Sequence, residues 1–143
     1  MELNETIKLV DSVYYFSFAY NTTKKSPLSN HQIPISSTMV VLMPIATLIG
    51  RYTNTSSTAT IKIDDSWLPN DGLVNVVSAQ YPTGDTFVEY NSGLEELQRG
   101  QWYVFPTLEG DHGAVIGMNG KTEETRKFYT DHIALIDSLE RIR

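Results

Sequence analysis

Two short runs of apolar and aromatic residues have the composition of β-strands. Residues 13–19, VYYFSFA, are rich in aromatic and β-branched side chains and contain no Gly or Pro, so we predict a strand buried on both faces. Residues 101–105, QWYVF, lie between Gly100 and Pro106 and form a second predicted strand. The alternation of apolar and polar positions in residues 86–90, TFVEY, predicts a third.

The clearest helical pattern fills residues 122–143, where apolar side chains recur at helical spacing. We predict Thr122 as its N-cap, with Glu123 and Glu124 at the positive end of the helix dipole. Arg141 and Arg143 suit the negative end.

A second helix is predicted over residues 39–50, MVVLMPIATLIG, with a kink at Pro44 and its end at Gly50. This apolar stretch is too short to span a bilayer, so it fits a buried helix or, as the alternative, an interfacial membrane-docking segment. Residues 5–12 are predicted to be the end of a further helix.

The segments between these elements are mostly polar. We predict a long loop over residues 20–38 and another over residues 54–60, whereas residues 73–77, LVNVV, fit a short strand or a buried helical turn equally well. Strands and helices in alternation predict an α/β fold with mostly parallel pairing. The whole chain, residues 1–143, is predicted to form a single domain.

Composition narrows the functional class. The 143-residue chain is 41% hydrophobic with a net charge of −6, as expected of a globular protein and unlike a nucleic-acid-binding one. It contains no cysteine, which excludes disulfides, iron–sulfur clusters and a thiol nucleophile. We therefore predict no nucleic-acid partner and no transmembrane segment.

One Asp and one His stand out because each lies in a glycine-flanked corner beside an apolar run. Asp71 lies in LPNDGLVNVV (68–77), and His112 follows 41 positions later (112 − 71) in LEGDHGAVIG (108–117). A histidine after a predicted strand is well placed to act as a general base, and a buried carboxylate would fix its tautomer. The alternative is that Asp71 only forms a turn and His112 is only solvated.

The remaining polar residues give weaker signals. His31 and His132 show no metal-ligand spacing, and the loop residues Asp64, Asp65 and Asp85 lack the cadence of a calcium loop, so we predict no metal site. The sequence also lacks the G-x-S-x-G nucleophile elbow of α/β-hydrolases. Ser92, in EYNSGLE, lacks the preceding glycine and follows Asp71.

Several stretches together resemble the C-terminal third of the secreted bacterial triacylglycerol lipases of the Geobacillus and Staphylococcus type. They are YYFSFA (14–19), DDSWLPNDGLVNVVS (64–78), DHGAVIG (111–117) and FY (128–129). The resemblance implies an incomplete α/β-hydrolase fold, Asp71 as catalytic acid and His112 as catalytic base. It also implies a structural calcium, but Ala114 stands where a Glu is expected and Asn119-Gly120 where Asp-Pro is expected. We therefore expect no cofactor in this chain.

The resemblance implies the C-terminal portion of a lipid ester hydrolase that is inactive alone and acts on a lipid ester once completed by an N-terminal part carrying the serine. The alternatives are a lipase-derived module that binds lipid or protein, with oligomers forming through an unpaired sheet edge, and a decayed gene fragment. The family implies secretion, whereas the first residues, MELNET, show no signal-peptide pattern and on their own predict a cytoplasmic chain.

Overall fold

The computed structural model of the chain describes residues 8–82, 84–91, 97–120 and 122–140. These fall into two compact units, Met1–Asp111 and His112–Arg143, each described here by itself. Whether the two units act as the single predicted domain stays a prediction.

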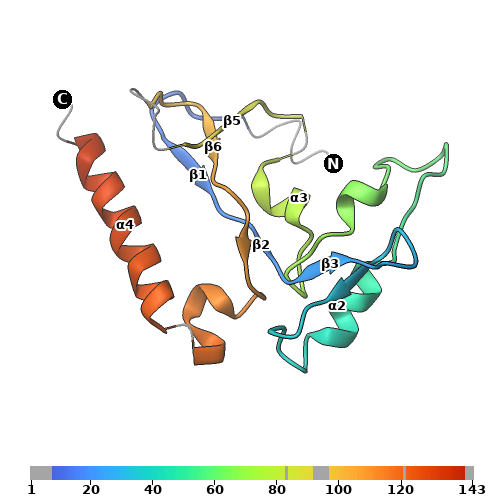
Figure 1. The fold of residues 1–143 in the computed structure, drawn as a ribbon. Coiled ribbons are helices and arrows are strands. Elements are labelled where there is room, and N and C mark those ends of the chain that lie inside the picture. Colours follow the sequence, from blue (N-terminus) through green and yellow to red (C-terminus); the bar gives the residue numbers. More distant parts are fainter. Residues whose placement is uncertain (1–7, 83, 92–96, 121, 141–143) are drawn as a thin grey trace. The chain divides into compact units, whose positions relative to one another are not determined.

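A parallel three-stranded sheet forms the centre of the first unit. Its strands are β1 (Tyr15–Ser17), β6 (Trp102–Val104) and β5 (Phe87–Glu89), in the order β1-β6-β5. In Figure 1 β1 and β6 run side by side. Phe16 is paired with Tyr103 across the two strands, and their ring centroids are 5.8 Å apart. The three predicted strands and their parallel pairing are confirmed.

Burial of β1 on both faces is wrong, because Tyr15 and Phe16 are only half-buried. Within the described residues β1 has a single strand neighbour and therefore lies at a sheet edge.

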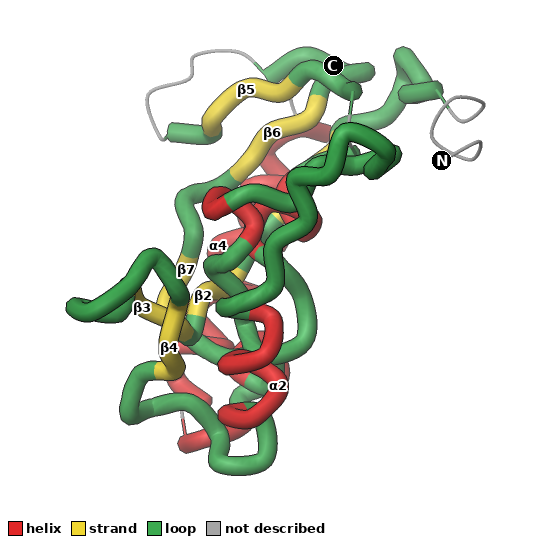
Figure 2. The backbone as a smooth tube through the Cα atoms, turned by 90° about the vertical axis from the view of Figure 1, so that its right-hand side faces the viewer, coloured by secondary structure: helices red, strands yellow, loops and turns green. Residues whose placement is uncertain are grey.

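The predicted loop over residues 20–38 contains short strands that the prediction missed. β2 (Tyr20–Asn21) pairs in parallel with β7 (Leu108–Glu109), and β3 (Thr23–Lys25) pairs antiparallel with β4 (Gln32–Pro34). These four strands are labelled in Figure 2. The β3–β4 hairpin closes where the Ser26 N–H donates to the carbonyl of His31 at 2.9 Å. Its strands are built largely from polar residues, so they lack the apolar alternation on which strand prediction depends.

The predicted helix over residues 39–50 is shorter than expected. α2 spans Met43–Ile49, and Pro44 lies in its first turn, where a missing N–H costs nothing, so the predicted kink is wrong. Gly50 ends the helix as predicted and packs against β4, where the Gln32 N–H donates to its carbonyl at 2.8 Å. Ala46 is fully buried, but Leu48 is 71% exposed, so the helix is buried on one side only.

Two short helices flank the Asn-Asp-Gly turn. η1 (Asp65–Trp67) precedes it and α3 (Val76–Gln80) follows it. The ambiguous residues 73–77 therefore contain a bend and the start of a helix, and no strand. Residues 54–60 form the predicted loop apart from a bridge between Asn54 and Ile63. The predicted N-terminal helix is wrong over residues 8–12, which contain a turn at Asp11 and Ser12 and no helix, and its residues 5–7 lie outside the described chain.

The second unit consists of two short helical turns and one long helix. η2 (Ala114–Ile116) and η3 (Met118–Gly120) lead into α4 (Thr122–Glu140). The Thr125 hydroxyl donates to the Ala114 carbonyl at 3.0 Å and ties the first turn of α4 to η2.

The predicted terminal helix and its acidic first turn are confirmed, but the predicted N-cap is wrong. Glu123 and Glu124 occupy its first turn, while Thr122 is the first helical residue and not the cap. Arg141 and Arg143 lie outside the described residues. Within the described ranges, no helix is long and apolar enough to cross a membrane.

Candidate active site

Asp71 is a buried carboxylate held by its own turn. The residue is 7% exposed, and its Oδ1 accepts hydrogen bonds from the N–H groups of Leu73 at 2.9 Å and Val74 at 2.7 Å. Its own N–H donates to the Val74 carbonyl at 3.0 Å. Asp71 is therefore a turn former, as the simpler interpretation predicted. Because its orientation is fixed and it is nearly dry, it also has the properties of a carboxylate that orients an imidazole.

Asn70 anchors this turn and was missed by the sequence analysis. Its side chain is fully buried, and its Nδ2 donates to the carbonyls of Ala46 at 3.2 Å and Leu68 at 2.9 Å. Its Oδ1 accepts the N–H of Gly72 at 2.9 Å. The only sequence signal was the Pro-Asn-Asp-Gly composition, which marks a turn but does not say which polar side chain faces inward.

Gly72 lets the turn pack closely against the segment that precedes α2. Its φ of +99° lies in the region that favours glycine. A Cβ at this position would lie 3.0 Å from the Leu42 Cβ and 3.3 Å from its Cδ1. The turn that carries Asp71 therefore rests directly on Leu42.

His112 is the first residue of the second unit and is exposed to solvent. The next two residues, Gly113 and Ala114, are buried, and the Gly113 carbonyl accepts the N–H groups of Ile116 at 3.2 Å and Met118 at 3.1 Å. The backbone that follows His112 is thus well fixed within its unit. Asp71 belongs to the first unit, so the surroundings of the two residues are defined separately and their pairing stays a prediction.

The other described candidate residues have local surroundings of their own. His31 is exposed beside the β3–β4 hairpin, and His132 lies on α4 with its Nδ1 against the Phe128 carbonyl. Ser92 lies outside the described residues. Asp64 caps η1 by accepting the N–H of Ser66 at 2.9 Å and its hydroxyl at 2.6 Å, and these bonds lower the pKa of Asp64.

The residues present do not fit the calcium site that the resemblance implies. Ala114, where a Glu is expected, is a buried residue of η2 whose methyl group offers no oxygen ligand. Over the described parts of the chain, no three His, Cys, Asp or Glu residues come together as metal ligands. The expectation of no cofactor remains a prediction.

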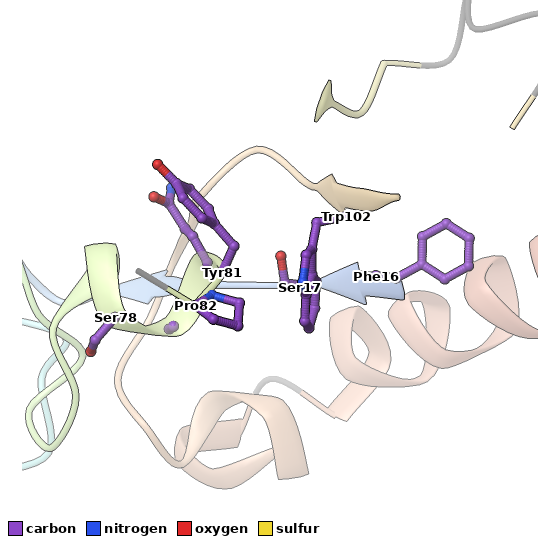
Figure 3. A pocket seen from close by; sticks show the side chains of 8 residues that line it. Phe16, Ser17, Ser78, Tyr81, Pro82 and Trp102 are labelled. Atoms are coloured by element: carbon purple, nitrogen blue, oxygen red, sulfur yellow. The ribbon is translucent and has the colours of Figure 1, made fainter. Parts of the chain in front are cut away.

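The first unit also contains a hollow whose lining does not include Asp71, shown in Figure 3. It has a volume of about 480 Å³, and Ser17, Tyr81, Pro82 and Trp102 are among its lining residues. Ser17 Oγ and Trp102 Nε1 are buried there, and neither has a hydrogen-bond partner among the described residues. Its lining contains no acid and no histidine, so it offers no groups for acid–base chemistry.

Comparison with known sequences connects the whole chain to one family. A family model described as Lipase-like, C-terminal domain, matches residues 1–142. The lipase of Staphylococcus hyicus is 29% identical over 118 residues, which make up 81% of this chain and 16% of that protein. Lipase 1 of Staphylococcus aureus is 26% identical over 138 residues, or 93% of this chain and 18% of that protein. The chain thus spans less than a fifth of these curated relatives.

Solved structures show the same relation. EstA from Clostridium botulinum superimposes with a TM-score of 0.79 at 33% identity, over 91% of this chain and 31% of that one. The crystal structure of Staphylococcus hyicus lipase gives a TM-score of 0.78 at 24% identity, over 98% of this chain and 35% of that one, and supports the fold alone. These likenesses confirm the predicted fold class, an incomplete α/β fold that covers about a third of each larger structure.

Proposed function

The chain belongs to the family of lipase-like C-terminal domains, and on this premise we propose that it is the C-terminal portion of a secreted lipid ester hydrolase. In this proposal Asp71 and His112 are the acid and the base of a Ser-His-Asp triad. The nucleophilic serine belongs to a different part of the enzyme, since the sequence contains no G-x-S-x-G.

The observation that carries the proposal is the state of Asp71. A carboxylate that is 7% exposed, with Oδ1 held by two backbone amides, has the fixed orientation that a group orienting an imidazole requires. His112 begins the next unit in an exposed position, where a substrate and a serine can reach its imidazole.

The chemistry follows from these roles. The serine hydroxyl attacks the acyl carbon of the ester, and His112 Nε2 takes the hydroxyl proton and returns it to the leaving alkoxide. Water then repeats the sequence on the acyl-enzyme. Asp71 accepts Nδ1–H of His112, which keeps Nε2 unprotonated and stabilises the imidazolium formed in each step. The chain alone supplies neither nucleophile nor oxyanion hole and should be inactive.

The tautomer of His112 tests the acid–base pair without any need for the serine. In the ¹⁵N-labelled chain at mildly alkaline pH, we expect His112 to hold its proton on Nδ1, and Asp71→Asn to abolish that preference. Asp65→Asn, at an exposed acid of η1, is the matched control and should change nothing. An unbiased His112 tautomer in the unmodified chain would refute the pair.

Activity provides the second test. The chain can replace the matching segment of the Staphylococcus hyicus lipase, and the hybrid can be assayed on a p-nitrophenyl ester. We expect Asp71→Asn or His112→Ala to lower kcat by about 10³- to 10⁴-fold in an active hybrid. Turnover by the chain alone, above that of the Asp71→Ala/His112→Ala double variant, would contradict the assignment of the nucleophile to another part.

A non-enzymatic binding module is the second candidate, favoured by exposed apolar surface. Val40 and Val41, just before α2, are 81% and 70% exposed, and β1 lies at an edge of its sheet within the described residues. This candidate predicts oligomers or a bound partner. Monomeric sedimentation of the chain without binding of an apolar dye would count against it.

A further inference from the structure

The residue immediately before His112 is a deeply buried carboxylate. Asp111 is 2% exposed, and its Oδ2 accepts the backbone N–H of Met39 at 2.8 Å, across 72 positions of sequence. Burying a carboxylate is costly unless hydrogen bonds replace its water. The triad as proposed makes no use of Asp111, so its burial calls for another role.

We propose that Asp111 is a positioning residue, which fixes the point where the chain passes into His112 by accepting the Met39 N–H. This inference rests on the proposed roles of Asp71 and His112. It adds a residue that touches neither substrate nor serine and acts only through the backbone next to the base.

The segment that Asp111 binds is the same one that supports the acid. Leu42, three positions after Met39, lies 3.0 Å from where a Gly72 Cβ would be, and the Ala46 carbonyl accepts the Asn70 side chain at 3.2 Å. Residues 39–46, here called the platform, are thus held by both neighbours of Asp71 and by the residue before His112.

The platform is held together by its own backbone hydrogen bonds. The N–H groups of Leu42 and Met43 both donate to the Met39 carbonyl, at 2.9 Å and 3.2 Å, and the Ala46 N–H donates to the Leu42 carbonyl at 2.8 Å. A displacement of Met39 would therefore be transmitted to Leu42 and Ala46, on which the Asp71 turn rests. The Asp71 turn and Asp111 are therefore both attached to the same segment of the chain.

Asp111 also completes a series of anchors along the chain that leads to the base. The Leu108 N–H donates to the Ala19 carbonyl at 2.9 Å, and the Gly110 N–H donates to the Asn21 carbonyl at 3.1 Å. These bonds fix the strand side of the loop as far as Gly110. The bond from Met39 to Asp111 is the next anchor, directly before His112.

The experiment uses the ¹⁵N-labelled 143-residue chain and measures two signals, the amide exchange of Met39 and the tautomer of His112. Asp111→Leu removes the acceptor, and we expect Met39 exchange to rise by about tenfold or more and His112 to average between tautomers. Asp111→Asn keeps one acceptor oxygen and should restore both signals in part. Glu109→Gln, at an exposed acid two positions earlier, is the control and should change neither.

The outcomes separate this inference from the proposed function. If Asp111→Leu accelerates Met39 exchange but leaves His112 in one tautomer, Asp111 has only a structural role and the inference fails while the acid–base pair stands. If His112 shows no preferred tautomer in the unmodified chain, the proposed function itself fails. Should Asp111→Leu not fold, Asp111→Glu decides, because the added methylene displaces the carboxylate. A His112 tautomer unchanged in that variant overturns the inference.

Discussion

Replacing Gly72 by Ala tests whether the Asp71 turn depends on close contact with the platform. At a φ of +99° an L-residue is strained, and holding it there costs about 1–3 kcal/mol. The new Cβ would also lie 3.0 Å from the Leu42 Cβ, tighter than ordinary van der Waals contact, and such overpacking costs a further 1–3 kcal/mol or so. Gly72→Ala should therefore lower the free energy of unfolding by about 2–6 kcal/mol.

Gly84 offers a matched control within the same unit. Its φ is also +99°, but no atom of the described residues beyond its chain neighbours lies within 4 Å of the position its Cβ would take. Gly84→Ala should show only the backbone term, about 1–3 kcal/mol. Urea unfolding of both variants, followed by circular dichroism, gives the difference between them, which measures the contact with Leu42. Equal destabilisation by the two substitutions would refute the close packing of the turn on the platform.

Three further predictions concern residues near the site or along the first unit. Asn70→Ala removes three buried side-chain hydrogen bonds and should lower the unfolding free energy by about 2–4 kcal/mol in urea titrations; a loss below about 1 kcal/mol would contradict its role as anchor. Hydrogen bonds from Ser66 lower the pKa of Asp64 below its usual 3.8. The stability that these bonds contribute is present at neutral pH and is lost as the pH falls through the lowered pKa. Ser66→Ala should therefore destabilise the chain near pH 6 but much less near pH 2. Pro44→Ala should change the free energy of unfolding by less than about 1 kcal/mol, because a first-turn proline costs the helix no hydrogen bond. A gain in stability of about 3 kcal/mol would instead indicate that Pro44 kinks the interior of a longer helix.

The elements that were predicted correctly from the sequence are those determined by the composition and spacing of their own residues. The aromatic runs around Phe16 and Tyr103 pack ring against ring across paired strands. The acidic first turn and the helical spacing of apolar residues in the terminal helix can both be recognised in its sequence. The polar strands β3 and β4 could not be predicted in this way. They are stabilised by pairing with each other and by contact between β4 and the end of α2, and these tertiary contacts leave no local sequence pattern.

The start of α2 shows how one residue type supports two opposite predictions. A proline in an apolar run indicates a kink if the run is one helix, and a helix start if the residues before it form a turn. Here the N–H groups of Leu42 and Met43 bond to the Met39 carbonyl, which sets a turn first and places Pro44 in the first helical turn. Because α2 begins only at Met43, Met39 lies outside the helix and its N–H makes no helical hydrogen bond. This N–H donates to Asp111 Oδ2.

In the candidate site, too, some features could be predicted from local sequence and others depend on contacts between distant segments. Asp71 was predictable because the Asn-Asp-Gly turn is a local device, and its Oδ1 indeed bonds the amides two and three positions ahead. Asn70 and Asp111 each lie directly before a candidate catalytic residue, yet each has a hydrogen-bond partner far along the chain, 24 positions away for Asn70 and 72 for Asp111. No periodicity encodes such a contact. A buried polar residue beside a candidate acid or base is therefore the signal to seek, because its burial requires a partner, and that partner shows which distant segment holds the site in place.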